Sequence, residues 1–206
     1  MRKYLTLFVA LFAFANISYA QFQPTAPKSF SNIKIENFGQ MDDNFYRGAQ
    51  PLPDDYKSLK ELGINTVIDL RKDATDYEKK SVEDLGMKYV NIPMTGWTTK
   101  DESVAEFLKV INDSSTGKVY VHCAAGKHRT GLVGAIYRLE KYGWDYDSAY
   151  KEMKNYEYYS GLFHGKIKDY VQDYYKKFGA EKQVAVKAAA ANAAASAKAA
   201  TAAQSN

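Results

Sequence analysis

The chain of 206 residues is 46% hydrophobic and 14% aromatic, which is enough to form one hydrophobic core and too little for two sizeable domains. Its formal net charge is +4, but Arg2 and Lys3 lie in the N-terminal segment, and the tail from Ala180 carries three lysines against one glutamate. Residues 21–179 therefore have no net charge, which argues against nucleic acid as a partner.

The N-terminus has the three parts of a secretory signal peptide. Two basic residues precede an apolar run from Tyr4 to Ile17, and Ser18-Tyr19-Ala20 has the small-x-small pattern of a cleavage site. The run is shorter than the roughly 20 apolar residues that a membrane-spanning helix needs. We therefore expect residues 1–20 to be removed on export to the periplasm or out of the cell, which leaves no stable membrane span.

Two segments of biased composition flank the predicted domain, which we place at residues 33–179. Residues 21–32 are polar and contain proline, which is typical of a linker. Residues 180–206 are rich in alanine and of low complexity, without the large side chains that would dock a helix. We expect both segments to be appendages of a single domain.

Short β-branched runs alternate with helical patterns through the domain. Strands are predicted at Ile33–Phe38, Asn65–Leu70, Lys88–Ile92 and Lys118–His122. Helices are predicted at Pro53–Leu62, Asp76–Leu85, Asp101–Asn112, Arg129–Tyr142, Asp145–Asn155 and Phe163–Phe178. Strands that alternate with helices predict an α/β domain with a central, mostly parallel sheet flanked by helices.

The residues after the fourth predicted strand carry the chemistry. Residues 123–129, hereafter the Cys123 loop, lead directly into a predicted helix. Backbone N–H groups of a short loop at a helix N-terminus converge on an anion, and the same field stabilises a thiolate. We therefore predict Cys123 as a nucleophile and Arg129 as a planar, bidentate clamp on phosphoryl oxygens. The other predicted substrate-binding residues are Ala124, Ala125, Gly126, Lys127 and His128.

The sequence His122-Cys123-x-x-Gly126-x-x-Arg129-Thr130 resembles the signature loop of the protein tyrosine phosphatase superfamily. The segments 45–51, 63–71 and 86–93 are similar to small bacterial-type, atypical dual-specificity phosphatases, so the resemblance covers about residues 38–178. It implies a hydrolase that forms a cysteinyl-phosphate and needs no metal or other cofactor. It also implies that Thr130 donates its hydroxyl toward the cysteine sulfur and that His122 orients the loop.

The resemblance further implies a general acid, an aspartate on a loop before the Cys123 loop. The corresponding stretch is 93–102, where Asp101 is our candidate and Glu102 the alternative. Thr99-x-x-Glu102 is also a capping-box pattern, so these acids have a purely structural explanation. Asp69 and Asp73 are possible substitutes.

The substrate is predicted only as a phosphorylated molecule. Lys127 and His128 add positive charge, as in the loops of inositol phosphate phosphatases, but a solvated lysine and a packed histidine explain them equally well. Phosphotyrosine protein stays a candidate. Arg47 and Arg71 could reach a highly charged substrate, yet we expect pairing with a local carboxylate such as Asp69.

Two classes of function remain open on the sequence alone. The first is a phosphoric monoester hydrolase acting on phosphotyrosine protein or inositol phosphates. The second is a catalytically silent phospho-ligand-binding module, which the uncertain general acid would allow. The sequence does not indicate an oligomeric state.

Overall fold

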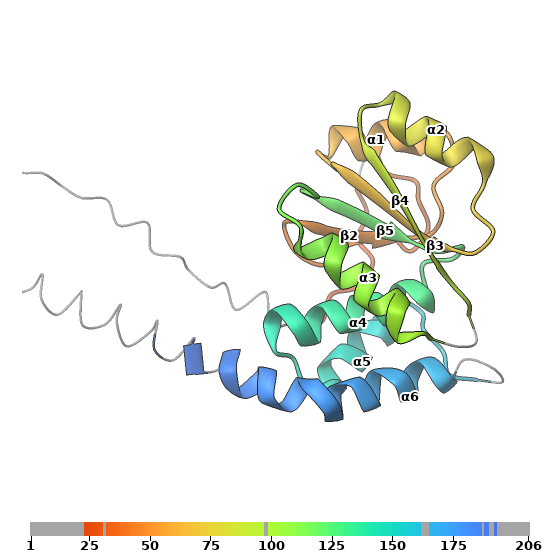
Figure 1. The fold of residues 1–206 in the computed structure, drawn as a ribbon. Helices are drawn as coiled ribbons and strands as arrows, with labels where there is room; N and C mark the ends of the chain where they lie inside the picture. The colour runs from red at the N-terminus through yellow and green to blue at the C-terminus, as the bar shows by residue number, and fades with distance from the viewer. Residues whose placement is uncertain are drawn as a thin grey trace, which may run out of the picture.

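A computed structural model describes residues 23–30, 32–96, 99–161, 165–186, 188–189 and 192, so the expected signal peptide lies outside the described residues. The five strands lie in the order β1-β2-β5-β3-β4, and only the β1–β2 pair is antiparallel (Figure 1). Their bounds are β1 Gly39–Gln40, β2 Phe45–Gly48, β3 Thr66–Arg71, β4 Lys88–Met94 and β5 Val119–His122. The predicted mostly parallel sheet flanked by helices is confirmed.

The helices cover both faces of this sheet. Their bounds are α1 Asp55–Glu61, α2 Asp76–Asp84, α3 Asp101–Asn112, α4 Arg129–Tyr142, α5 Tyr146–Asn155 and α6 Gly165–Tyr174. Neighbouring residues of a strand face opposite sides, so Val67 joins the cluster formed with α1 and α2, whereas Ile68 joins the larger cluster of α3 and α4. Burial on both faces explains the continuous apolar runs of the central strands.

The first predicted strand, Ile33–Phe38, is wrong. Glu36 and Asn37 form a turn, and Asn37 has a φ of 53°, which interrupts extended backbone. The strand that pairs with β5 on this side is β2, in which all four residues are buried. Asparagine tolerates the left-handed conformation better than most residues, so the residue pattern of 33–38 does not reveal the turn.

The N-terminal stretch that we expected to be a linker contacts the domain. Thr25 donates from its backbone N and its hydroxyl to Glu152, each at 2.9 Å. Asn155 donates to the Thr25 carbonyl at 2.8 Å, and the Lys28 backbone N donates to the Phe38 carbonyl at 2.9 Å. The bonds of Thr25 hold the segment against the end of α5, and the bond of Lys28 connects it to the residue before β1.

On the C-terminal side of the domain, α6 continues as a π-helical turn, Tyr175–Gly179, and then as helix over residues 180–186. The helix thus extends beyond the predicted stop at Phe178. Lys182 forms an ion pair with Glu140 of α4. Among the described residues, no helix is both long and apolar enough to cross a membrane.

Candidate active site

The Cys123 loop connects β5 with α4 at the edge where the parallel strands end. Cys123 is buried, with 3% of its surface exposed, whereas Ala124 and Ala125 are exposed at the mouth of the loop. The helix begins at Arg129, so the loop lies at the positive end of the α4 dipole. This is the strand, loop and helix start that the sequence predicts.

The loop is held from outside by donors to its carbonyl groups. The Gln50 backbone N donates to the Ala124 carbonyl at 3.1 Å. Arg47 Nη2 and Asn37 Nδ2 donate to the Gly126 carbonyl at 2.7 Å and 3.1 Å. In a trans peptide the N–H points away from the C=O, so turning these carbonyls outward directs the following N–H groups toward the inside of the loop. The outer donors thereby shape an anion site.

Gly126 is required at its position for two reasons. Its φ of +68° lies in the left-handed region. A Cβ there would also lie 2.5 Å from the carbonyl carbon of Gly48 and 2.8 Å from the backbone N of Ala49. The loop therefore packs directly against the backbone at the end of β2.

The pKa of the Cys123 thiol lies below its ordinary value of 9.0. Burial is the largest single effect and raises this pKa. The hydroxyl and the backbone N–H of Thr130, the positive charge of Arg129 and the N–H of Gly126 all lower the pKa, and together they outweigh burial. All these groups favour the thiolate, which is the nucleophilic form.

The Arg129 guanidinium lies over the ends of two neighbouring strands. Its Nη1 is 3.5 Å from the carbonyl oxygen of Leu70 and 3.4 Å from that of Met94. The side chain is half-buried, and these carbonyls hold one edge of the planar group. The structure thus brings together Cys123, Arg129 and Thr130, as the sequence predicts.

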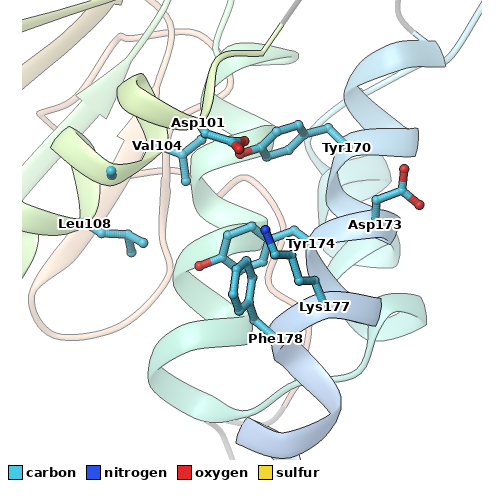
Figure 2. Close-up of a pocket in the computed structure, with 9 residues that line it drawn as sticks. Asp101, Val104, Leu108, Tyr170, Asp173, Tyr174, Lys177 and Phe178 are labelled. Carbon is cyan, nitrogen blue, oxygen red and sulfur yellow. The ribbon is translucent and has the colours of Figure 1, made fainter.

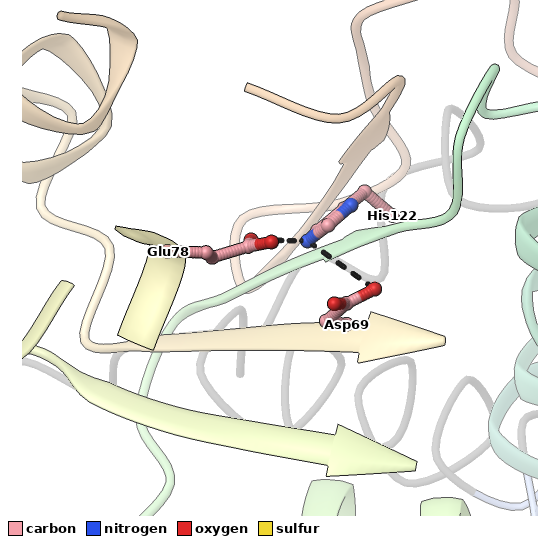
Figure 3. Close-up of side chains that lie close together, drawn as sticks. All are labelled: Asp69, Glu78 and His122. Carbon is pink, nitrogen blue, oxygen red and sulfur yellow. Dashed lines mark ion pairs between the residues drawn. The ribbon is translucent and has the colours of Figure 1, made fainter. Parts of the chain in front are cut away.

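His122 lies in a buried group of charged side chains (Figure 3). Its Nε2 is 2.7 Å from Glu78 Oε1 and 3.9 Å from Asp69 Oδ1. Arg71 Nε lies 3.2 Å from Asp69, and Arg71 Nη2 lies 3.7 Å from Glu78. The expected pairing of Arg71 with Asp69 is confirmed. This pairing and full burial commit Asp69 to the interior, which makes it a poor substitute for the general acid.

The types of these donors would suit a metal ion, because Asp69, Glu78 and His122 offer three ligand atoms within 4.8 Å of one another. The Arg71 guanidinium, however, already brings a positive charge to both carboxylates. A second cation beside it would be repelled. The group is therefore better described as an ion-pair network.

Asp101 is turned toward α6 (Figure 2). It is exposed, and the Tyr170 hydroxyl donates to its Oδ1 at 2.7 Å. The two residues lie at one end of a hollow of about 400 Å³ between α3 and α6, whose other end is lined by Tyr174 and Phe178. The capping box does not form, because α3 begins after Lys100 without a side-chain cap.

The remaining candidate acids are exposed to solvent, and the two basic residues of the loop make local contacts. Glu102 and Asp73 are exposed. Lys127 Nζ forms an ion pair with Glu157 at 2.7 Å. The His128 ring packs edge-on against two tyrosine rings, with centroid distances of 5.4 Å and 4.6 Å. Local contacts therefore account for both basic residues, whatever their role toward a substrate.

Sequence reasoning missed the residues that support the loop from elsewhere in the fold. Arg47 is buried and binds a loop carbonyl, where we expected a carboxylate partner. Its guanidinium lies 3.9 Å from the centre of the Tyr156 ring. Asn37 and Glu78 showed no signal in the sequence. The only hint for Arg47 and Gln50 was the resemblance of residues 45–51 to phosphatase segments.

Comparison with known proteins gives consistent results. The profile described as "Tyrosine phosphatase family" matches residues 32–195. The dual specificity protein phosphatase TpbA of Pseudomonas aeruginosa strain UCBPP-PA14 is 29% identical over 119 residues, which are 57% of this chain and 53% of that protein. The inositol diphosphatase DSP4 of Arabidopsis thaliana is 28% identical over an alignment of 163 residues, and the match covers 68% of this chain and 78% of that protein. The match thus spans about half the length of TpbA.

Solved structures show the same fold. The crystal structure of P. aeruginosa TpbA has a TM-score of 0.63 and 23% identity, and the match covers 80% of this chain and 97% of that one. The core catalytic domain of the PP-IP phosphatase SIW14 from S. cerevisiae has a TM-score of 0.60 and 20% identity, covering 68% and 86%. The α/β arrangement around the Cys123 loop is therefore a known one.

Proposed function

Since the chain belongs to the tyrosine phosphatase family, we propose that it is a cysteine-dependent phosphatase that hydrolyses phosphoric monoesters. The observation that carries the proposal is the buried Cys123, whose thiol pKa is lowered by Thr130, Arg129 and the Gly126 N–H. A thiolate and a phosphoryl clamp in one anion site are what this chemistry needs.

The reaction has two steps. The Cys123 thiolate attacks phosphorus, the bond from phosphorus to the leaving oxygen breaks, and that oxygen takes a proton. Water then attacks the cysteinyl-phosphate and gives a proton back to the group that protonated the leaving oxygen, the phosphorus–sulfur bond breaks, and inorganic phosphate leaves. Arg129 and the loop N–H groups stabilise the charge on the equatorial oxygens in both steps, and the Thr130 hydroxyl stabilises the departing sulfur.

Asp101 is our proposed proton donor in the first step. To act, its carboxyl group must leave the Tyr170 hydroxyl and turn toward the Cys123 loop. An aryl phosphate has a good leaving group and depends less on this proton than an alkyl phosphate does. Asp101→Asn should therefore slow an alkyl phosphate more than an aryl phosphate, and equal effects on both would remove Asp101 from the mechanism.

Phosphotyrosine protein and inositol phosphates are the proposed substrate classes. The support comes from the relatives, one named a dual specificity protein phosphatase and one an inositol diphosphatase. A solved structure of TpbA also holds phosphotyrosine. The open mouth of the loop at Ala124 and Ala125 is compatible with either class.

The deciding experiment measures phosphate release from an aryl phosphate, phosphotyrosine peptides and inositol polyphosphates by wild type and Cys123→Ser. We expect release by wild type only, unaffected by a chelator, and the preferred substrate identifies the class. Tight binding of phosphorylated ligands without release by wild type would instead indicate a phospho-ligand-binding module.

Export is a further part of the proposal, supported by the basic start, the apolar run and the small residues that end at Ala20. The test is to express the full chain and determine the N-terminal residue of the product in the periplasm and the medium. A product that begins at Gln21 supports export. Full-length protein retained in the cytoplasm contradicts it.

A further inference from the structure

Arg47 is a buried cation without a carboxylate partner of its own. It belongs to β2, and only 1% of its surface is exposed. Its Nη2 donates to the Gly126 carbonyl at 2.7 Å, its guanidinium carbon lies 3.9 Å from the centre of the Tyr156 ring, and its Nε has no acceptor among the described residues. Arginine stays protonated in proteins, and a buried charge is costly unless an opposite charge compensates it.

The carboxylates nearby are committed to other cations. Glu152 accepts from Arg138 through both oxygens, from Nη2 at 2.8 Å and from Nε at 3.0 Å, and this pair is itself buried. Asp42 lies 3.8 Å from Lys141. Within the described residues, Arg47 forms no ion pair, so these five side chains leave one positive charge uncompensated inside the protein.

The uncompensated charge lies directly against the Cys123 loop. Arg47 binds the carbonyl of Gly126, and the N–H of the same glycine bonds the Cys123 sulfur. Because β5 lies between β2 and β3, Arg47 reaches the loop from one side of the nucleophile's strand. Arg129 reaches it from the other side, over the ends of β3 and β4. An anion inside the loop is therefore in the right place to be the missing counter-charge.

The remaining neighbours of Arg47 hold the guanidinium in place without neutralising it. Gly134 of α4 leaves room for it, since a Cβ there would lie 3.2 Å from Arg47 Nη1. The phenols of Tyr120 and Tyr156 face the same group, and burial raises the pKa of both, so they stay neutral. The electrostatic interaction with Cys123 favours the charged guanidinium.

We propose that Arg47 is a positioning residue whose buried positive charge is the permanent counter-charge of the Cys123 loop, first for the thiolate and then for the phosphoryl group. Arg129 holds the phosphoryl oxygens directly, whereas Arg47 acts through the loop backbone and is never exposed to substrate. The inference rests on the proposed function for its significance. The state of the thiol and the binding of phosphate can, however, be measured without turnover.

Arg47→Gln removes the charge and keeps a side-chain N–H donor. Cys123 is the only cysteine, so the rate of iodoacetamide modification of the full chain reports on a single thiolate. The midpoint of this rate against pH should rise by about 0.5–1 unit, which is about threefold to tenfold slower modification below the midpoint. With Cys123→Ser as the background, the dissociation constant of inorganic phosphate should rise about tenfold. An unchanged midpoint or an unchanged phosphate affinity overturns the proposal.

Two further variants separate the charge from the hydrogen bond. Arg47→Lys keeps the charge without the planar fork and should restore most of the midpoint and of the phosphate affinity. Asn37→Gly removes the neutral amide that donates to the same Gly126 carbonyl at 3.1 Å, and glycine accepts the φ of 53° at this position. It should change both quantities much less than Arg47→Gln does. Equal effects of Asn37→Gly and Arg47→Gln, or no rescue by lysine, overturn the proposal.

A measurement on wild type covers the case in which Arg47→Gln does not fold. Arginine is scarce in this chain, so the Nε signal of Arg47 can be assigned by nitrogen NMR after labelling. This signal should move with the alkylation midpoint as the thiol ionises, and a signal that stays constant through the midpoint overturns the proposal. If wild type has a low midpoint and binds phosphate but shows no turnover, the proposed function fails while the role of Arg47 stands.

Discussion

Gly126→Ala tests whether the backbone of the Cys123 loop must pack against β2. The left-handed φ of +68° costs an alanine about 1 kcal/mol. The new Cβ would lie 2.5 Å from the carbonyl carbon of Gly48, where an ordinary contact is at least 3.4 Å. Since the opposing atoms are backbone, the loop must move by about 1 Å, and a misplacement of that size costs about 100-fold in rate.

The assay is kcat/KM on an aryl phosphate together with urea unfolding. We expect kcat/KM about 100-fold lower and a free energy of unfolding about 2 kcal/mol lower. Gly161→Ala is the control, because the nearest atom to its added Cβ is 3.9 Å away. Wild-type kinetics and stability in Gly126→Ala would refute the argument that this contact fixes the loop.

Three further substitutions probe the clamp, the N-terminal segment and a buried acid. Arg129→Lys should lower kcat/KM by about 100-fold with little change in stability, because an ammonium cannot hold two phosphoryl oxygens in the planar geometry. Thr25→Val should lower the free energy of unfolding, measured with urea, by about 1–3 kcal/mol, because the Thr25 hydroxyl donates to the buried Glu152. Thr25→Ser keeps the hydroxyl and should retain most of the wild-type free energy of unfolding. For Asp42, burial raises the carboxyl pKa, but two tyrosine hydroxyls and a backbone N–H outweigh it and hold the pKa below 3.8. The ionised Asp42 carboxylate therefore stabilises the fold above pH 3.8, and this stabilisation is lost as the pH falls through the lower pKa of the folded state. Asp42→Asn should lower the stability by about 1 kcal/mol in thermal unfolding at pH 7, and progressively less below pH 3.8.

A helix or strand was predicted correctly where its residue pattern ran without interruption along the sequence. Helices α3 and α4 have the predicted bounds, because their apolar periodicity is uninterrupted. The strand β2 was missed because four residues that include an arginine and a glycine show no alternation. The turn at Asn37 was missed because its positive φ leaves no trace in the composition.

The same distinction applies to the site. Cys123, Arg129 and Thr130 could be found because they lie within eight consecutive residues. Arg47 and Glu78 contact residues that lie 79 and 44 positions away in the sequence, so only the folded chain shows these contacts. Asp101 was placed near the site by analogy alone, and its contact with Tyr170 was not foreseeable.

The outer support of the loop ties the site to the start of the described chain. Arg47 reaches the Gly126 carbonyl while its guanidinium packs on the Tyr156 ring. The Tyr156 hydroxyl lies 2.9 Å from the Thr25 hydroxyl and donates to the Ala26 carbonyl at 3.1 Å. Cutting the chain at residue 33 would remove these partners and expose the ring beneath Arg47. The segment before the first strand is therefore a physical part of what holds the anion site in shape.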